Sequence, residues 1–126
     1  MKLLIDTHVL IWTLADSHRL SKQTAQLLAD GSNEVMVSSG SAYEIEFKRP
    51  RSSELARLPA DLYQAAESIG LTWLPISPAH AVMAGRLPRL HGDPFDRIII
   101  AQALVENATV ISCDPLIAPY GVPTLW

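Results

Sequence analysis

The 126-residue sequence has a single cysteine, Cys113, and no apolar run long enough to cross a membrane. One cysteine cannot form a disulfide within the chain, which fits a reducing compartment. A membrane-spanning helix needs about 20 predominantly apolar residues. The opening segment resembles a signal peptide only in part, because Asp6 interrupts its apolar run and no clear cleavage site follows. The sequence therefore predicts a cytoplasmic protein without a membrane segment.

Positive charge is also scarce, since 10 Lys and Arg stand against 13 Asp and Glu and give a net charge of −3. An acidic chain is not an obvious nucleic-acid binder, so such a partner requires a local basic patch or a bound cation. The apolar share of 48% and the charged share of 18% are typical of globular proteins. The length suits one domain, residues 1–126, with its own core.

Strand and helix patterns alternate along the chain. Apolar, β-branched segments predict strands at residues 2–6, 34–38, 71–76, 109–112 and 122–125. Capping residues and apolar periodicity predict helices at residues 7–15, 21–31, 41–48 and 60–69, from Ser77 onward, and at 93–107. Such alternation predicts an α/β fold with a mostly parallel central sheet of four to five strands, flanked by helices.

Four acids fall where these elements meet one edge of the predicted sheet. Asp6 ends the first strand, within LLIDTHVLIW, and Asp114 follows the strand at 109–112. Glu44 lies in the predicted first turn of the helix after strand 34–38. Asp96 begins the helix that leads into strand 109–112, with Ile99 and Ile100 on the same helical face. Ligands bind at the carboxyl edge of parallel sheets, so we expect these acids to converge there.

Carboxylates that converge need a reason to tolerate one another. Two like charges about 4 Å apart repel by roughly 4 kcal/mol at an effective dielectric of 20. Either some carboxyls stay protonated or divalent cations neutralise them. A set of oxygen ligands without cysteine or histidine suits Mg²⁺ or Mn²⁺ better than zinc. Carboxylates that hold such ions are the apparatus of phosphodiester hydrolysis.

Each acid also has a purely structural interpretation. Asp6 can cap the following helix, and Asp114 can begin a turn before its proline. Glu44 can pair with Lys48 four residues later, and Asp96 can interact with the helix dipole. Only the convergence of the four acids favours a site over these alternatives.

Several other polar residues are interpreted without a role in the chemistry. We expect Asp93 to cap its helix, because Asp-Pro is a common helix start. Cys113 is interpreted as a packing residue. Four histidines without metal-ligand spacing are interpreted as surface or loop residues: His8, His18, His80 and His91. Three tryptophans are assigned to the core or to an interface: Trp12, Trp73 and Trp126.

Four segments, in order along nearly the whole chain, resemble the successive motifs of PIN-domain ribonucleases. They are LLIDTHVLIW, VSSGSAYEIEFK, GDPFDRIIIAQA and VISCDPLIAPYGV. The resemblance is greater to the VapC-type toxins of bacterial toxin–antitoxin pairs. It implies a three-layer PIN-like fold, a Mg²⁺- or Mn²⁺-dependent endoribonuclease acting on RNA, a homodimer, and a cognate antitoxin whose C-terminal segment occupies the toxin groove.

The same resemblance assigns the site residues. The four metal-binding acids of the family match Asp6, Glu44, Asp96 and Asp114. Thr7 and Ser112 match the small hydroxyl residues beside the first and fourth acids. The candidate phosphate contacts are basic residues near the predicted site: Lys48, Arg49, Arg51, Arg86, Arg89 and Arg97.

Two other functions remain open. The domain can be a catalytically silent PIN-like module that binds RNA or a peptide, although such a module has little need of four acids. It can also be a metal-dependent phosphatase acting on small phosphoesters. The sequence has neither a nucleophilic aspartate motif nor a phosphate-binding loop, which disfavours the phosphatase.

Overall fold

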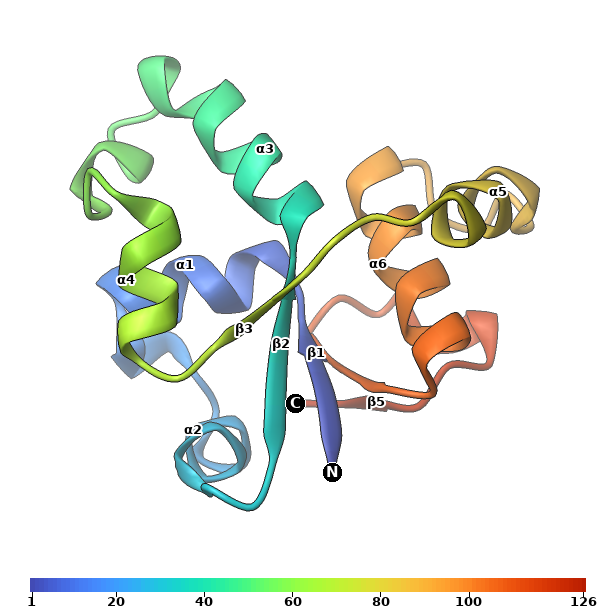
Figure 1. Cartoon of the computed structure of the whole chain (residues 1–126), viewed down its shortest axis with the longest axis horizontal. Helices are drawn as coiled ribbons and strands as arrows, with labels where there is room; N and C mark the ends of the chain where they lie inside the picture. Colours follow the sequence, from blue (N-terminus) through green and yellow to red (C-terminus); the bar gives the residue numbers. More distant parts are fainter.

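A computed structural model describes residues 1–126 as a five-stranded parallel sheet with helices on both faces (Figure 1). The strand order is β3-β2-β1-β4-β5. The strands are β1 (Lys2–Ile5), β2 (Glu34–Ser38), β3 (Thr72–Leu74), β4 (Thr109–Ile111) and β5 (Thr124–Leu125). The α-helices are α1 (Thr7–Ala15), α2 (Lys22–Ala29), α3 (Ser39–Lys48), α4 (Leu62–Ser68), α5 (Pro78–Arg86) and α6 (Pro94–Glu106). Short 3₁₀ helices lie at η1 (Ser17–Arg19), η2 (Arg49–Arg51), η3 (Leu55–Arg57) and η4 (Ala118–Tyr120).

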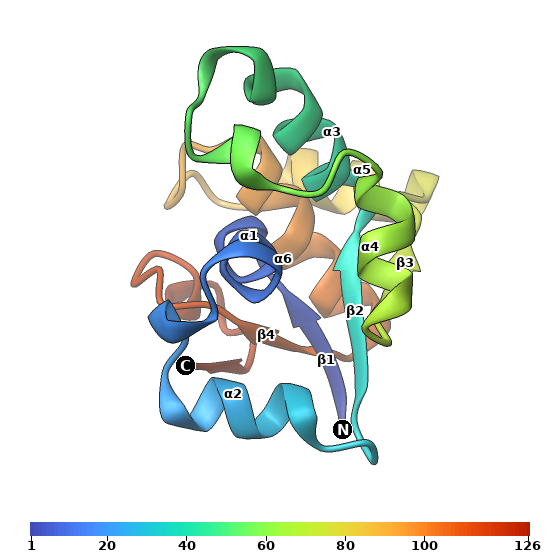
Figure 2. The same ribbon diagram turned by 90° about the vertical axis from the view of Figure 1, so that its left-hand side faces the viewer.

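The central strand β1 supplies side chains to both faces of the sheet. Because side chains alternate along a strand, Leu3 and Ile5 enter the core beneath α1, α3 and α4, while Leu4 enters the core beneath α6. Figure 1 shows α1 and α4 on one side of β1 and β2 and α6 on the other, and Figure 2 views the molecule from the side of α1 and α4. The three-layer α/β architecture predicted from the sequence is therefore confirmed.

Two helices begin with aspartate caps at the carboxyl edge of the sheet. Asp6 caps α1, as its structural interpretation allows, because its Oδ1 accepts the Val9 N–H at 2.8 Å. The expected cap of α6 is confirmed, since Asp93 Oδ1 accepts the Phe95 N–H at 2.8 Å. These two aspartates fix the starts of the helices that border the carboxyl edge of the sheet.

The third helix begins earlier than predicted. Its first residue is Ser39 rather than Ser41, and the side chain of Ser38 accepts the Gly40 N–H. Glu44 consequently lies in the second helical turn, not in the first as expected. The third strand is shorter than predicted, spanning only Thr72–Leu74.

The aromatic side chains assigned to the core do pack there. Trp12 is buried, and the half-buried Trp73 and Trp126 pack against the same apolar cluster. Trp12 and Trp126 meet edge to face with ring centroids 5.7 Å apart. Among the helices, none combines the length and the apolar character that crossing a membrane requires.

Candidate metal centre

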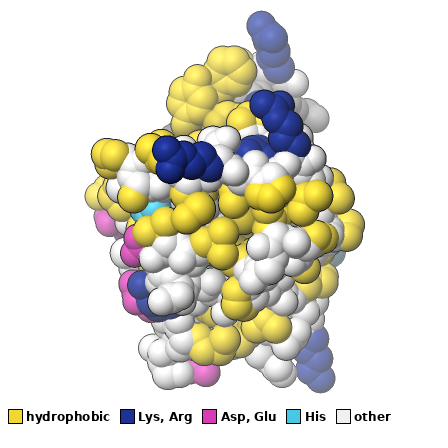
Figure 3. Space-filling model, turned by 90° about the vertical axis from the view of Figure 1, so that its right-hand side faces the viewer, with side chains coloured by type: hydrophobic (Ala, Val, Ile, Leu, Met, Phe, Trp, Pro, Cys, Tyr) yellow, Lys and Arg dark blue, Asp and Glu magenta, His cyan; other side chains and the backbone are white.

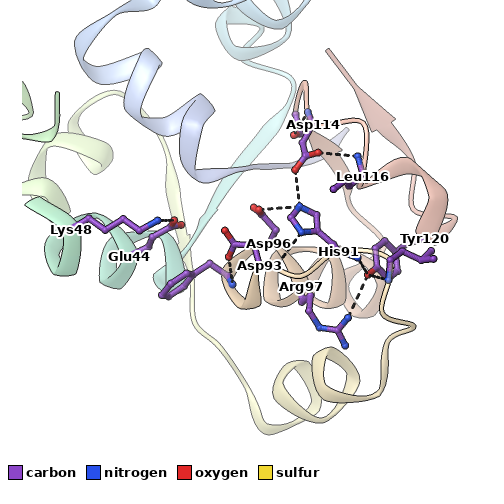
Figure 4. A network of polar contacts seen from close by, with 12 residues as sticks. Glu44, Lys48, His91, Asp93, Asp96, Arg97, Asp114, Leu116 and Tyr120 are labelled. Atoms are coloured by element: carbon purple, nitrogen blue, oxygen red, sulfur yellow. Dashed lines mark hydrogen bonds and ion pairs between the residues drawn. The ribbon is translucent and has the colours of Figure 1, made fainter. Parts of the chain in front are cut away.

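The carboxyl edge of the sheet gathers four acids, two that follow strands and two that lie on helices. Strands β1 and β4 are neighbours there, with Ile5 beside Ile111 and the Asp6 N–H bonded to the Ile111 carbonyl at 3.1 Å. Asp6 follows β1 directly, and Asp114 lies three residues beyond β4. Helices α3 and α6, which carry Glu44 and Asp96, pack against each other. Figure 4 shows Glu44, Asp96 and Asp114 around this edge.

The acids influence one another electrostatically. Burial, together with the nearby charges of Asp93, Asp6 and Glu44, raises the pKa of Asp96 to about 7, against an opposing effect of His91. Burial also raises the pKa of Asp6, although hydrogen bonds from the Ser112 hydroxyl and the Val9 N–H oppose this. A buried carboxyl with a raised pKa gains stability from a bound cation. The carboxylate donor set therefore fits Mg²⁺ or Mn²⁺.

A histidine completes one side of this cluster. The Nε2 atom of His91 lies 2.7 Å from Asp114 Oδ2 and 3.2 Å from Asp96 Oδ2. His91 lies in the loop before α6, as one half of the prediction had it, but it is only 8% exposed, so it is not a surface residue. Its position two residues before the helix cap Asp93 places His91 in the loop that leads into α6, but that spacing does not report its contact with Asp114.

Asp114 is held at both carboxylate oxygens. Oδ1 accepts the Leu116 N–H at 2.9 Å, and Oδ2 faces His91 Nε2. Burial acts to raise the pKa of Asp114, but the hydrogen bonds from Leu116 and His91 outweigh it and lower that pKa. Asp114 is therefore the acid of this edge that is best prepared to stay ionised.

Glu44 occupies the opposite side, on α3. Its carboxylate accepts a 2.6 Å hydrogen bond from Lys48 Nζ, so the ion pair considered from the sequence does form. Glu44 is 7% exposed, whereas about half of the Lys48 side chain is exposed. The hydrogen bond to Glu44 raises the pKa of Lys48. Lys48 therefore remains charged at the mouth of the acid cluster.

Two buried hydroxyls lie at the same edge. Thr7 Oγ1 is 2.9 Å from Ser41 Oγ, a contact that ties α1 to α3. Ser112 Oγ accepts the Asp114 N–H at 3.0 Å, which leaves its proton for Asp6. These hydroxyls hold the backbone from which Asp6 and Asp114 project.

Two of the six predicted phosphate contacts, Arg97 and Arg49, already donate their hydrogen bonds to backbone carbonyls. The Arg97 guanidinium donates to the carbonyls of Ala84, Leu87 and Pro88 at 2.8 Å each. The Arg49 guanidinium likewise donates to three carbonyls and to Glu46, with carbonyl partners Leu55, Leu58 and Pro59. These two arginines hold loops together and are poorly placed to bind phosphate. The other four basic side chains are exposed: Lys48, Arg51, Arg86 and Arg89.

Two further interpretations were wrong. His80 is 2% exposed, accepts the Ser77 N–H at Nδ1 and faces Glu106 through Nε2 at 2.9 Å, so it is no surface residue. Cys113 is exposed rather than packed in the core. Histidines His8 and His18 are exposed, as expected.

Known proteins resemble this chain along nearly its whole length. Ribonuclease VapC22 of Mycobacterium tuberculosis is 29% identical in an alignment 129 residues long, which covers 98% of this chain and 97% of that protein. VapBC2 from Rickettsia felis, bound to a DNA fragment from its promoter, aligns with a TM-score of 0.73 at 18% identity. This alignment covers 99% of this chain and 98% of that one.

A second solved structure agrees. DNA-bound VapBC from Salmonella typhimurium aligns with a TM-score of 0.72 at 16% identity, covering 99% of this chain and 97% of that one. At these identities the solved structures show a shared fold. The model of the PIN domain family matches residues 3–120 of the sequence. With the parallel sheet and the acids at its carboxyl edge already in place, this match shows that the chain belongs to the PIN domain family.

Proposed function

We propose that this chain is a metal-dependent endoribonuclease that serves as the toxin of a VapBC-type toxin–antitoxin pair and is neutralised by a cognate antitoxin. The observation that carries the proposal is the convergence of acids at one sheet edge, where burial and neighbouring charges raise the pKa of Asp96 to about 7. The similarity to a protein named ribonuclease VapC22 over 98% of the chain supports it.

Asp6 and Asp96 are the principal ligands in this proposal, with Glu44 and Asp114 completing the site directly or through water. Burial raises the pKa values of both principal acids, so a cation gains most from their ionised forms. A bound Mg²⁺ or Mn²⁺ supplies activation of a water molecule and stabilisation of the leaving oxygen. The hydroxyls of Thr7 and Ser112 act by fixing the local backbone, not by attacking the substrate.

The exposed basic residues bind the RNA phosphates. Lys48 projects beside Glu44, and Arg89 lines a hollow that also contains His91. Arg51 lines a hollow together with Lys48, and Arg86 lies at the end of α5. Phosphate contacts need only a local patch, which reconciles an RNA substrate with the net charge of −3.

The partner surfaces follow from exposed apolar side chains. Tyr43 and Phe47 stack on α3, with ring centroids 5.9 Å apart, and both are exposed beside the site. We assign the antitoxin segment to this aromatic surface. Figure 3 shows apolar side chains across the face on the side of α5 and α6, where Val82 and Met83 are exposed. We assign the homodimer contact to that face, and the assembly to the cytoplasm.

Cleavage of RNA by the purified chain tests the enzymatic part. The expected result is cleavage of structured and unstructured RNA with Mn²⁺ or Mg²⁺, loss of cleavage with EDTA, and loss of cleavage in Asp6→Asn. The variant must retain the circular dichroism spectrum of the parent. A chain that binds RNA but leaves it intact with either ion is the silent binding module instead.

Expression in a bacterial host tests the biological part. The expected result is growth arrest that Asp6→Asn abolishes and that co-expression of a cognate antitoxin relieves. Growth arrest that persists with Asp6→Asn would contradict the assignment of toxicity to this site.

A further inference from the structure

His91 is the buried side chain that joins the acid cluster without being one of its acids. We infer that His91 is a positioning residue: its Nε2–H donates to Asp114 and Asp96 and fixes the arrangement of the two carboxylates. The inference rests on the proposed function, because it concerns the residues assigned there to the cation. It gives His91 a role that differs from that of a metal ligand.

The hydrogen bonds of the imidazole select its tautomer. The backbone N–H of Asp93 points at Nδ1 of His91 over 3.1 Å, so Nδ1 must offer a lone pair. The proton of the neutral ring therefore sits on Nε2, which faces Asp114 Oδ2 at 2.7 Å and Asp96 Oδ2 at 3.2 Å. A ring with this proton directs a donor at both carboxylates.

The surrounding loop holds the ring in place. The hydroxyl of Tyr120 accepts the N–H groups of Leu90 and His91, at 3.1 and 2.7 Å, and donates to the Pro88 carbonyl at 2.8 Å. Arg97 donates to the same Pro88 carbonyl. Figure 4 shows His91 between these anchors and the acids. A donor fixed by its own backbone loop can orient carboxylates that come from two other segments.

Distances alone also permit a metal triad. Ligand atoms of His91, Asp96 and Asp114 lie within 4.8 Å of one another. The tautomer argues against that arrangement, since the Nε2 proton occupies the direction from which a metal must approach. Histidines that donate to metal-binding carboxylates tune the site from outside, and replacing such partners typically weakens metal affinity or activity about 10- to 100-fold.

The chain supplies a matched control in His80. Its Nδ1 accepts the Ser77 N–H at 3.0 Å and its Nε2 lies 2.9 Å from Glu106 Oε2, so its hydrogen bonds have the same form as those of His91. It is also buried, at 2% exposure against 8% for His91. His80 joins α5 to α6 at Glu106, the last residue of α6, whereas His91 joins the acids at the first turn of that helix.

Three variants distinguish a histidine that orients the carboxylates from one that only fills space in the loop. In His91→Gln the side-chain amide can still donate to the carboxylates from near the Nε2 position. In His91→Asn the shorter side chain can still accept the Asp93 N–H but cannot reach the acids. The control is His80→Gln. For each protein, Mn²⁺ affinity is measured by calorimetry, and RNA cleavage is measured against Mn²⁺ concentration.

We expect His91→Asn to weaken Mn²⁺ binding about 10- to 100-fold, and His91→Gln to recover most of that loss. We expect His80→Gln to lower the melting temperature without changing Mn²⁺ affinity. Equal affinity in His91→Asn and the parent, or an equal loss in His91→Asn and His91→Gln, would overturn the inference. A parent chain that binds no Mn²⁺ would overturn the proposed function and this inference together.

The tautomer is also measurable in the unaltered protein, which covers the case in which His91→Asn does not fold. Nitrogen chemical shifts of the ¹⁵N-labelled imidazole, recorded with and without Mg²⁺, distinguish the two tautomers. The expected result is an Nε2-protonated His91 in both samples. Loss of the Nε2 proton on addition of Mg²⁺ would show a ligand and would overturn the positioning role.

Discussion

The two sides of the acid cluster are held in different ways. On one side, Glu44 pairs with Lys48, which lies four residues away on the same helix and is about half exposed. On the other side, Asp114 pairs with the buried His91, which lies 23 residues away and is anchored by Tyr120. The first pair can rearrange within one helix, whereas the second is built into a loop.

This difference suggests that the two sides of the acid cluster have different roles. Lys48 is half exposed on a flexible stem, so it can move from Glu44 to a phosphate when a cation takes its place beside the buried carboxylate. A buried donor among fixed hydrogen bonds cannot move without leaving polar groups unsatisfied. We therefore expect the His91 side to set the geometry of the acids and the Lys48 side to meet the substrate.

The largest effect is expected from Asp96→Asn, which removes the acid that contacts the His91 side and is coupled to Glu44. Cleavage of RNA should fall by on the order of 1,000-fold, since metal catalysis supplies several kcal/mol. Without metal at pH 8 the variant should be at least as stable as the parent, because it lacks a buried carboxylate. A variant that cleaves at the parental rate would contradict the assignment of Asp96.

Arg97→Met tests the rigidity of the His91 side. The substitution leaves the carbonyls of Ala84 and Leu87 without their side-chain donor, and the Pro88 carbonyl with the Tyr120 hydroxyl alone. We expect a loss of on the order of 3 kcal/mol in the free energy of unfolding, measured by urea titration. The control Arg86→Met removes an exposed arginine of α5 and should change the free energy by less than about 0.5 kcal/mol. Equal effects of the two variants would show that Arg97 does not brace the loop.

The pH dependence of Mn²⁺ affinity sharpens the comparison further. With a folded-state pKa of about 7, Asp96 holds a proton that the cation must displace below that pH. In the metal-free protein, the stability that this proton contributes is fully present below the ordinary pKa of 3.8 and is lost as the pH rises to about 7.

Mn²⁺ affinity should therefore rise up to about tenfold per pH unit below pH 7 and level off above it. Calorimetry at constant ionic strength measures this slope. His91→Gln should keep the slope, which separates Asp96 from the histidine beside it. An affinity that does not change between pH 5 and pH 8 would contradict the raised pKa of Asp96.

The smallest effect is expected from Lys48→Met, on the exposed side. Losing its pair with Glu44 should cost about 1 kcal/mol of stability, the upper end for exposed pairs, because Glu44 is buried while Lys48 is half exposed. RNA binding should weaken, and the slope of log affinity against log salt should fall by about one if Lys48 contacts a phosphate. Filter binding of RNA to the Asp6→Asn background at several salt concentrations measures this. An unchanged salt slope would remove Lys48 from the phosphate contacts.

The sequence was informative where the interactions are local or follow from element order. The pair of Glu44 and Lys48 is visible from their spacing, and the cap formed by Asp93 is visible from the following proline. The common edge of Asp6, Glu44, Asp96 and Asp114 follows from the alternation of strands and helices, because parallel strands end at the same side.

The sequence was uninformative where a loop makes the contact. His91 reaches Asp114 only because the loop at residues 87–93 folds back over Tyr120, and no spacing reports that fold. The partners of Arg49 and Arg97 are backbone carbonyls, which no residue type marks. Both arginines therefore resembled phosphate contacts, although the structure uses them to hold loops.

The central claim is that a divalent cation binds among these acids, with His91 outside its coordination shell. The most direct test is the anomalous diffraction signal of Mn²⁺ in crystals of the protein. We predict a peak between the carboxylates of Asp6 and Asp96, with the Nε2 atom of His91 on Asp114 rather than on the ion. A peak coordinated by His91, or no peak at this edge at saturating Mn²⁺, would contradict the account.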